Sequence, residues 1–123
     1  MTPEHRERAT EVRRAVLGAD FPAAAPADET AAAFSEAALD FVWGTIWARD
    51  VISRRDRSIA TLSMLTALNR PHELRIHVQV ALNNGLTREE ILEVLLHASV
   101  YCGFPAAVDA MRIAREVLAD TTS

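Results

Sequence analysis

The stretch Arg70–Pro105, RPHELRIHVQVALNNGLTREEILEVLLHASVYCGFP, decides the fold of this chain. It holds three of the four histidines, the only cysteine, the only tyrosine and two of the four glycines. Glycine is the commonest residue just beyond the end of a helix, so Gly85 and Gly103 divide the stretch into two predicted helices. Their polar side chains recur at helical spacing, which brings them together on shared faces. Earlier segments are expected to supply walls, supports and clamps around these two helices.

The first predicted helix of this stretch is HELRIHVQVALNN, with Pro71 in its first turn and Gly85 after its end. Its apolar stripe consists of Leu74, Val78, Ala81 and Leu82. His77 falls at the edge of this stripe rather than on the polar face, whereas His72 in the first turn is expected to be exposed. Spacing alone favours a core histidine, with its ring nitrogens hydrogen-bonded, over a catalytic histidine at position 77.

The second predicted helix begins at a capping box, because Thr87 and Glu90 have the T-x-x-E spacing. Its buried stripe consists of Ile91, Leu95, Ala98 and Cys102. Glu93, His97 and Tyr101 follow one another at intervals of four and therefore share an adjacent face. This row is either an amphipathic flank with an ordinary Glu–His pair or a functional row, and spacing favours neither.

The remaining segments also have helical periodicity. We expect helices over residues 4–17, 30–43 and 53–70, and a last helix from Pro105 through AAVDAMRIAREVLA. No β-alternation of useful length occurs. At 123 residues the chain has room for one core, so we predict an all-α, single-domain bundle of about six helices over residues 1–123.

Two of these segments carry candidate binding residues. Trp43 and Trp47 share a face and precede Arg49. The two tryptophans are expected either to be core or subunit-interface residues or to form the wall of a site for a small anionic ligand. The helix over 53–70 opens with Ser53 and Asp56 at capping-box spacing and continues as IATLSMLTAL, which is apolar nearly all round. Such a helix is covered on all sides, in part by other subunits. Of the arginines in its first turn, Arg57 lies nearest the apolar part.

Composition excludes several classes of protein. The net charge of −4 and the scattered arginines argue against nucleic-acid binding. No apolar run approaches a membrane span, no secretory signal precedes the first helix, and a lone cysteine suits a reducing cytoplasm. The histidines lack metal-ligand spacing and no Gly-rich phosphate loop occurs, so we expect neither a metal nor a cofactor. The chemistry that these residues still allow is acid–base catalysis by histidine, with arginines to bind anionic groups.

Three segments together resemble the carboxymuconolactone decarboxylase family: WGTIWARD, RRDRS and HVQVALNNGLTREEILEVLLHASVYCGFPAA. The resemblance runs from about Glu7 to Leu118, in matching order and spacing. It implies an alkylhydroperoxidase D-like helical fold, a homo-oligomer (trimer or hexamer) and no cofactor. It also implies decarboxylation of 4-carboxymuconolactone to β-ketoadipate enol-lactone in the protocatechuate branch of aromatic catabolism.

Two departures refine this resemblance. The alkylhydroperoxidase D-like relatives carry C-x-x-C-x-x-x-H, and this chain has Arg70 and Glu73 at the cysteine positions before His77. Thiol peroxidase chemistry needs both sulfurs, so that activity is excluded. Many of the decarboxylase sequences have an acid where this chain has Thr45, which leaves room for a paralogue acting on a related lactone.

The resemblance also implies roles for single residues. His77 becomes the first candidate for the general acid or oxyanion donor, and His97 and Tyr101 supply a second donor or proton route, with Glu93 orienting His97. Arg49 and Arg57 are expected to bind the substrate carboxylate, and Trp47 to form an apolar wall. The rival interpretations are an enzyme that decarboxylates or isomerises a related lactone, and a non-catalytic helical oligomer that binds a small acid or a partner protein.

Overall fold

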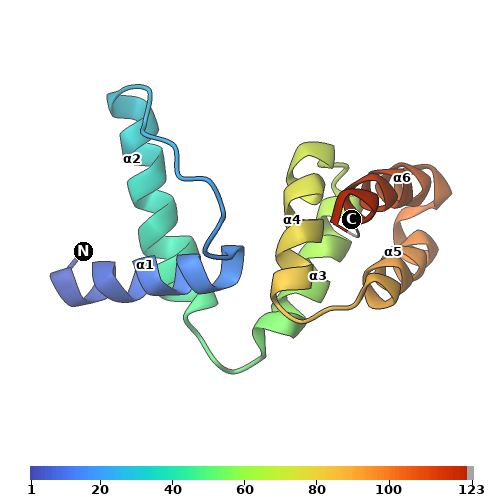
Figure 1. Ribbon diagram of the computed structural model, residues 1–123, viewed down its shortest axis with the longest axis horizontal. Helices are drawn as coiled ribbons and strands as arrows, with labels where there is room; N and C mark the ends of the chain where they lie inside the picture. Colours follow the sequence, from blue (N-terminus) through green and yellow to red (C-terminus); the bar gives the residue numbers. More distant parts are fainter. Residues whose placement is uncertain (122–123) are drawn as a thin grey trace. The chain divides into compact units, whose positions relative to one another are not determined.

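The computed structural model describes residues 1–121, and over these residues the chain is entirely helical (Figure 1). This confirms the predicted all-α class. The chain forms two compact units, Met1–Arg54 and Arg55–Ser123. The predicted single domain over 1–123 stays a prediction. None of the described helices is both long and apolar enough to cross a lipid bilayer.

The N-terminal unit consists of α1 (Pro3–Leu17), α2 (Glu29–Ala38) and the π-helix η1 (Leu39–Trp47). Thr2 caps α1, and Gly18 ends it at a φ of 99° that suits glycine. Asp28 caps α2 by accepting a hydrogen bond from the backbone N–H of Ala31 at 2.8 Å. The predicted helix over 30–43 therefore exists but extends to Trp47, with its second half wound as a π-helix.

Helix α1 packs across η1, where Gly44 is buried. The ring of His5 occupies the space that a side chain at Gly44 would need. From there His5 Nε2 reaches Asp40 Oδ1 at 2.8 Å. Phe34 of α2 and Phe41 of η1 are both exposed in this unit, and α2 buries none of its side chains.

The C-terminal unit consists of α3 (Arg54–Ala67), α4 (Pro71–Asn83), α5 (Arg88–Cys102) and α6 (Phe104–Thr121) (Figure 1). All four helices contribute to one apolar core, with α4 and α5 both packed on α6. The core comprises Leu62, Leu74, Val78, Ala81, Leu86, Ile91, Leu95, Ala110, Ile113, Ala114, Val117 and Leu118. The predicted stripe of α4 therefore faces the core, and so do Ile91 and Leu95 of α5. Ala98 is buried outside this cluster, and Cys102, which the pattern placed in the buried stripe, is only half-buried at the end of the helix.

Polar contacts fix the ends of these helices. The capping box of α5 is present, with the Glu90 backbone N–H donating to Thr87 Oγ1 at 3.1 Å and the Thr87 N–H to Glu90 Oε1 at 2.9 Å. In the same connection between α4 and α5, Asn84 Nδ2 donates to the buried Ser58 Oγ at 2.9 Å, which ties the end of α4 to α3. Arg88 Nη1 donates to the Leu118 carbonyl of α6 at 2.7 Å.

Helix α3 is only partly covered within its unit. Leu62 is fully buried and Ile59 and Leu65 pack against the core, whereas Met64 and Leu68 are exposed. The all-round apolar pattern of the sequence therefore exceeds what the C-terminal unit itself can bury.

Candidate active site

His77 lies in the middle of α4, between the core residues Leu74, Val78 and Ala81 on one side and solvent on the other. Its side chain is half-buried, and its Nδ1 atom is buried with no hydrogen-bond partner among residues 1–121. Burial lowers the pKa of His77, since charge is disfavoured away from water, while the negative charge of Glu73 acts in the opposite direction. The imidazole is therefore mainly neutral at pH 7.

This environment differs from that of a satisfied core histidine. A buried ring nitrogen normally has a partner, because leaving it without one costs about 1–3 kcal/mol. An imidazole with one buried nitrogen that lacks a hydrogen-bond partner is suited to bind or protonate a ligand. His77 is thus the most chemically distinctive of the residues that the sequence singled out.

Glu93, His97 and Tyr101 share an exposed face of α5. The rings of His97 and Tyr101 lie 5.4 Å apart between centroids at 45°, which agrees with the predicted row. Tyr101 is 80% exposed. Among residues 1–121, no hydrogen bond or ion pair joins Glu93 to His97 or joins His77 to the row. The structure therefore shows no direct polar link between the row and His77.

Arg57 lies in the first turns of α3 and is half-buried, with a buried Nε atom. Its neighbour Ser58 is held by Asn84, which fixes this end of α3 beside the end of α4. Arg54 is exposed, and Arg55 forms an ion pair with Glu90 of α5. Of the three arginines, Arg57 is the one directed inward, in agreement with its predicted position.

Trp47 and Arg49 belong to the N-terminal unit, separately from the other predicted residues. Trp47 is only 8% exposed and its ring lies 5.8 Å from that of the half-buried Trp43. Arg49 is exposed, and its backbone N–H donates to the Ile46 carbonyl at 3.1 Å where η1 ends. Trp47 is therefore mainly a packing residue of its unit, and Trp43 is the more accessible indole.

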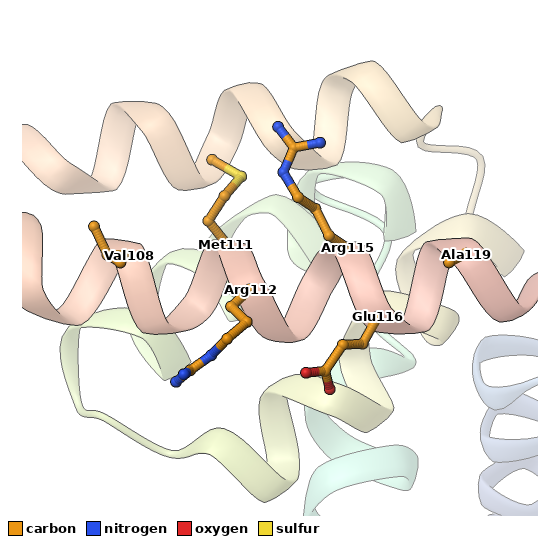
Figure 2. Close-up of a pocket in the computed structure, with 6 residues that line it drawn as sticks. All are labelled: Val108, Met111, Arg112, Arg115, Glu116 and Ala119. Carbon is orange, nitrogen blue, oxygen red and sulfur yellow. The ribbon is translucent and has the colours of Figure 1, made fainter.

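Open hollows lie on the outer surface of the C-terminal unit. One, along α6, has a volume of about 600 Å³ and is lined by Val108, Met111, Arg112, Arg115, Glu116 and Ala119 (Figure 2). Arg112 is paired with Asp109 at 3.0 Å and Glu116 with Arg75 at 2.6 Å. Another, of about 200 Å³, lies between α5 and α6 and is lined by apolar residues together with Ser99. None of the predicted site residues lines either hollow, so neither is a candidate active site.

Sequence reasoning left one residue near His77 without a role. Glu73 precedes His77 by four residues on α4, a spacing that places two side chains side by side on a helix. The i,i+4 spacing of Glu73 and His77 is the sequence signal that identifies this neighbour.

Comparison with known proteins places this helical chain in a family. Residues 32–116 match the model of the family described as carboxymuconolactone decarboxylase, a match that includes α3, α4, α5 and much of α6. A 4-carboxymuconolactone decarboxylase of Acinetobacter baylyi is 45% identical over 80 residues, which are 65% of this chain and 60% of that protein.

Two further relatives align over more of the chain. A nitrosuccinic acid decarboxylase of Metarhizium robertsii is 36% identical over 111 residues, covering 89% of this chain and 78% of that protein. An uncharacterised 15.0 kDa protein of Paracoccus denitrificans is 33% identical over 85 residues, covering 67% of this chain and 63% of that protein. This chain belongs to the carboxymuconolactone decarboxylase family.

Proposed function

We propose that this chain is a carboxy-lyase that converts 4-carboxymuconolactone to β-ketoadipate enol-lactone without a metal or an organic cofactor. The observation that carries the proposal is the 45% identity with a relative of that name over 80 residues. The half-buried imidazole of His77 adds a group able to handle the proton. The aligned stretch covers 60% of that relative, so activity and substrate are both proposals.

The chemistry of this substrate explains how a protein can act without a cofactor. The leaving carboxylate is attached to the γ carbon of an unsaturated lactone. When its C–C bond breaks, the electron pair moves through the ring double bond to the lactone carbonyl, and carbon dioxide leaves. The resulting dienolate then takes a proton at the ring carbon α to the carbonyl. The protein must hold the substrate, stabilise the developing oxyanion and supply that proton.

His77 is proposed for the last two tasks. A neutral imidazole donates a hydrogen bond to the developing oxyanion, and an imidazolium delivers the proton. Partial burial strengthens either interaction, because fewer water molecules compete. The exposed row of Glu93, His97 and Tyr101 is proposed as a second donor or proton route, with Glu93 orienting His97.

Arginines are proposed to hold the carboxymethyl arm, because a planar guanidinium can bind a carboxylate through two hydrogen bonds. Arg57 is the stronger candidate, since its Nε is already buried, and Arg49 is the second. Trp47, with Trp43 beside it, is proposed as the apolar wall. We expect the variants Arg57→Ala and Arg49→Ala to bind the dianionic lactone more weakly in equilibrium dialysis, and Arg115→Ala to bind it normally. Unchanged affinity in both variants would place the clamp elsewhere.

A second candidate substrate is nitrosuccinic acid, because the relative named for it aligns over 89% of this chain. Nitrosuccinic acid and 4-carboxymuconolactone share a succinate unit, HOOC–C–CH₂–COOH, in which the carbon bearing the leaving carboxylate also bears an electron sink. In one compound the sink is a nitro group, and in the other it is the unsaturated lactone. The same clamp and the same proton donor would serve both. Thr45, where an acid is usual, is compatible with this broader substrate class.

One experiment separates these candidates. Carbon dioxide release is measured with each acid at equal concentration, and loss of the conjugated butenolide is followed by ultraviolet absorption. We expect faster turnover of 4-carboxymuconolactone. Turnover of nitrosuccinic acid alone would replace the first proposal with the second. Loss of the butenolide without release of carbon dioxide would indicate isomerisation of a lactone. Tight binding without any turnover would support the non-catalytic oligomer.

We also propose that the chain assembles as a homo-oligomer, a trimer or a hexamer. Met64 of α3 and Leu68 directly after this helix support the proposal, since both are exposed in their unit although the segment has the apolar pattern of a covered helix. A buried subunit contact would cover them.

A further inference from the structure

Glu73 and His77 form a pair on one face of α4. Glu73 lies in the first turn of the helix and His77 one turn later, so their side chains are neighbours. Glu73 is exposed, whereas His77 is half-buried. The acid therefore lies at the solvent edge of the imidazole, in a position to influence its charge without being buried itself.

Glu73 has no competing partner among residues 1–121, since it forms no ion pair or side-chain hydrogen bond there. Arg75, which follows on α4, is engaged with Glu116 of α6 through a 2.6 Å hydrogen bond. The carboxylate of Glu73 is thus available to the histidine that follows it.

Two causes act on the pKa of His77, and they oppose each other. Burial lowers it, and the charge of Glu73 raises it. The charged side chains on the helices around α4, including Arg57 of α3, Glu93 of α5 and Glu116 of α6, are not among these causes. In the described residues, Glu73 is the charge that counteracts the burial of His77.

We propose that Glu73 is the positioning residue of His77: its negative charge, one helical turn before the imidazole, stabilises the imidazolium that delivers the proton after decarboxylation. This role rests on the proposed function. Glu73 itself neither gains nor loses a proton. It acts through His77, because a neighbouring negative charge favours the charged form of an imidazole.

The test is a titration of His77 in the absence of substrate. The Cε1–H resonance of His77 is followed by NMR from pH 4.5 to 8.5 in the wild type and in Glu73→Gln, with assignment by its disappearance in His77→Gln. We expect Glu73→Gln to lower the pKa of His77, because the opposing charge is removed while burial remains. Glu89→Gln is the matched control: Glu89 is also an exposed acid in the first turn of a helix. Its substitution should leave the His77 titration unchanged.

A second measurement needs no variant. Glu73 is exposed, so about 1 M salt should screen its charge and lower the pKa of His77 in the wild type. Glu73→Asp keeps the charge and should retain a wild-type-like titration more closely than Glu73→Gln. An unchanged His77 titration in Glu73→Gln, or in wild type at high salt if that variant does not fold, would overturn the proposal.

Kinetics supply the link to catalysis. With the active substrate we expect Glu73→Gln to lower kcat by roughly 3–30-fold at neutral pH with little change in KM, a fraction of the 10²–10⁴ that a whole general acid contributes. A rise in KM with unchanged kcat would instead make Glu73 a binding residue and overturn the proposed role. If neither acid is decarboxylated at all, the proposed function fails, whereas the titration still decides whether Glu73 acts on His77.

Discussion

His77 combines two features that proton transfer requires, an imidazole and a half-buried position on a rigid helix. Its Nδ1 atom is buried and lacks a partner within the described residues, and burial lowers the pKa of the ring. Glu73 opposes that effect and so reduces the cost of protonating the ring, which the proposed role of His77 requires.

We expect His77→Ala to lower turnover of 4-carboxymuconolactone by at least about 100-fold, because a general acid contributes roughly 10²–10⁴ in rate. Carbon dioxide release in single-turnover assays is the measurement. His72→Ala is the control, since His72 is an exposed histidine on the same helix. Near-normal turnover in a folded His77→Ala protein would remove His77 from the mechanism.

At position 77, the sequence predicts the location of the side chain but not its hydrogen bonding. Its place at the edge of an apolar stripe was visible in the sequence, and the structure confirms it. That its Nδ1 lacks a partner was not visible, because helical spacing places neighbours along α4 but not the side chains of other helices. The same holds for Ser58 and Asn84, whose hydrogen bond joins residues 26 positions apart.

At the scale of elements, the helix ends follow local chemistry. Gly18, Gly85 and Gly103 all have positive φ angles at or just after helix ends, and Thr87 and Glu90 form the predicted capping box. These features depend on residues within one turn of each other, so the sequence shows them directly.

The cap gives an element-scale prediction. Thr87→Ala removes the side-chain acceptor for the Glu90 N–H and should lower the free energy of unfolding by about 0.5–2 kcal/mol. Urea unfolding followed by far-ultraviolet circular dichroism measures the change. Thr10→Ala is the comparison, because it removes an exposed threonine from inside α1 rather than from a cap. Equal stability of Thr87→Ala and wild type would show that α5 does not depend on this cap.

The π-helix η1 is the element that the sequence did not reveal. Its wider turn places Thr45 Oγ1 at 3.1 Å from the carbonyl of Asp40, five residues earlier, and Gly44 leaves room for the ring of His5. π-Helical turns are stabilised by such specific contacts and occur often at functional sites. Because the contact with α1 spans more than thirty residues of sequence, hydrophobic periodicity predicted only an ordinary helix here.

At the scale of the whole molecule, one apolar surface stands out on the C-terminal unit. Leu96 and Val100 of α5 and Phe104 and Val108 of α6 are between 55% and 73% exposed, and Leu96, Phe104 and Val108 line the same hollow between the two helices. We call them the α5–α6 apolar face. Contiguous apolar surface of this kind usually marks an interaction site, and it adjoins the exposed Tyr101.

We therefore expect light scattering to give a mass of three or six times the 13.5 kDa of one chain. The double variant Val100→Glu, Val108→Glu should lower that mass, because burying two carboxylates in a subunit contact is unfavourable. Val51→Glu changes an exposed valine outside this face and should leave the mass unchanged. A wild-type protein that is monomeric at micromolar concentration would contradict the proposed assembly.

The sequence by itself determined the all-α class, the helix ends, the core stripes of α4 and α5 and the family, since all of these depend on neighbouring residues or on patterns that run along the chain. Only the tertiary structure decided the burial of Trp47, the π-helical winding of η1, the exposure of the α5 row and the state of His77 beside Glu73. Each of these depends on which distant side chains remove water from a group, and burial sets both packing energy and charge. Of the proposed site residues, His77 and its neighbour Glu73 belong to the stretch Arg70–Pro105, Arg57 belongs to α3, and Arg49 and Trp47 belong to the N-terminal unit.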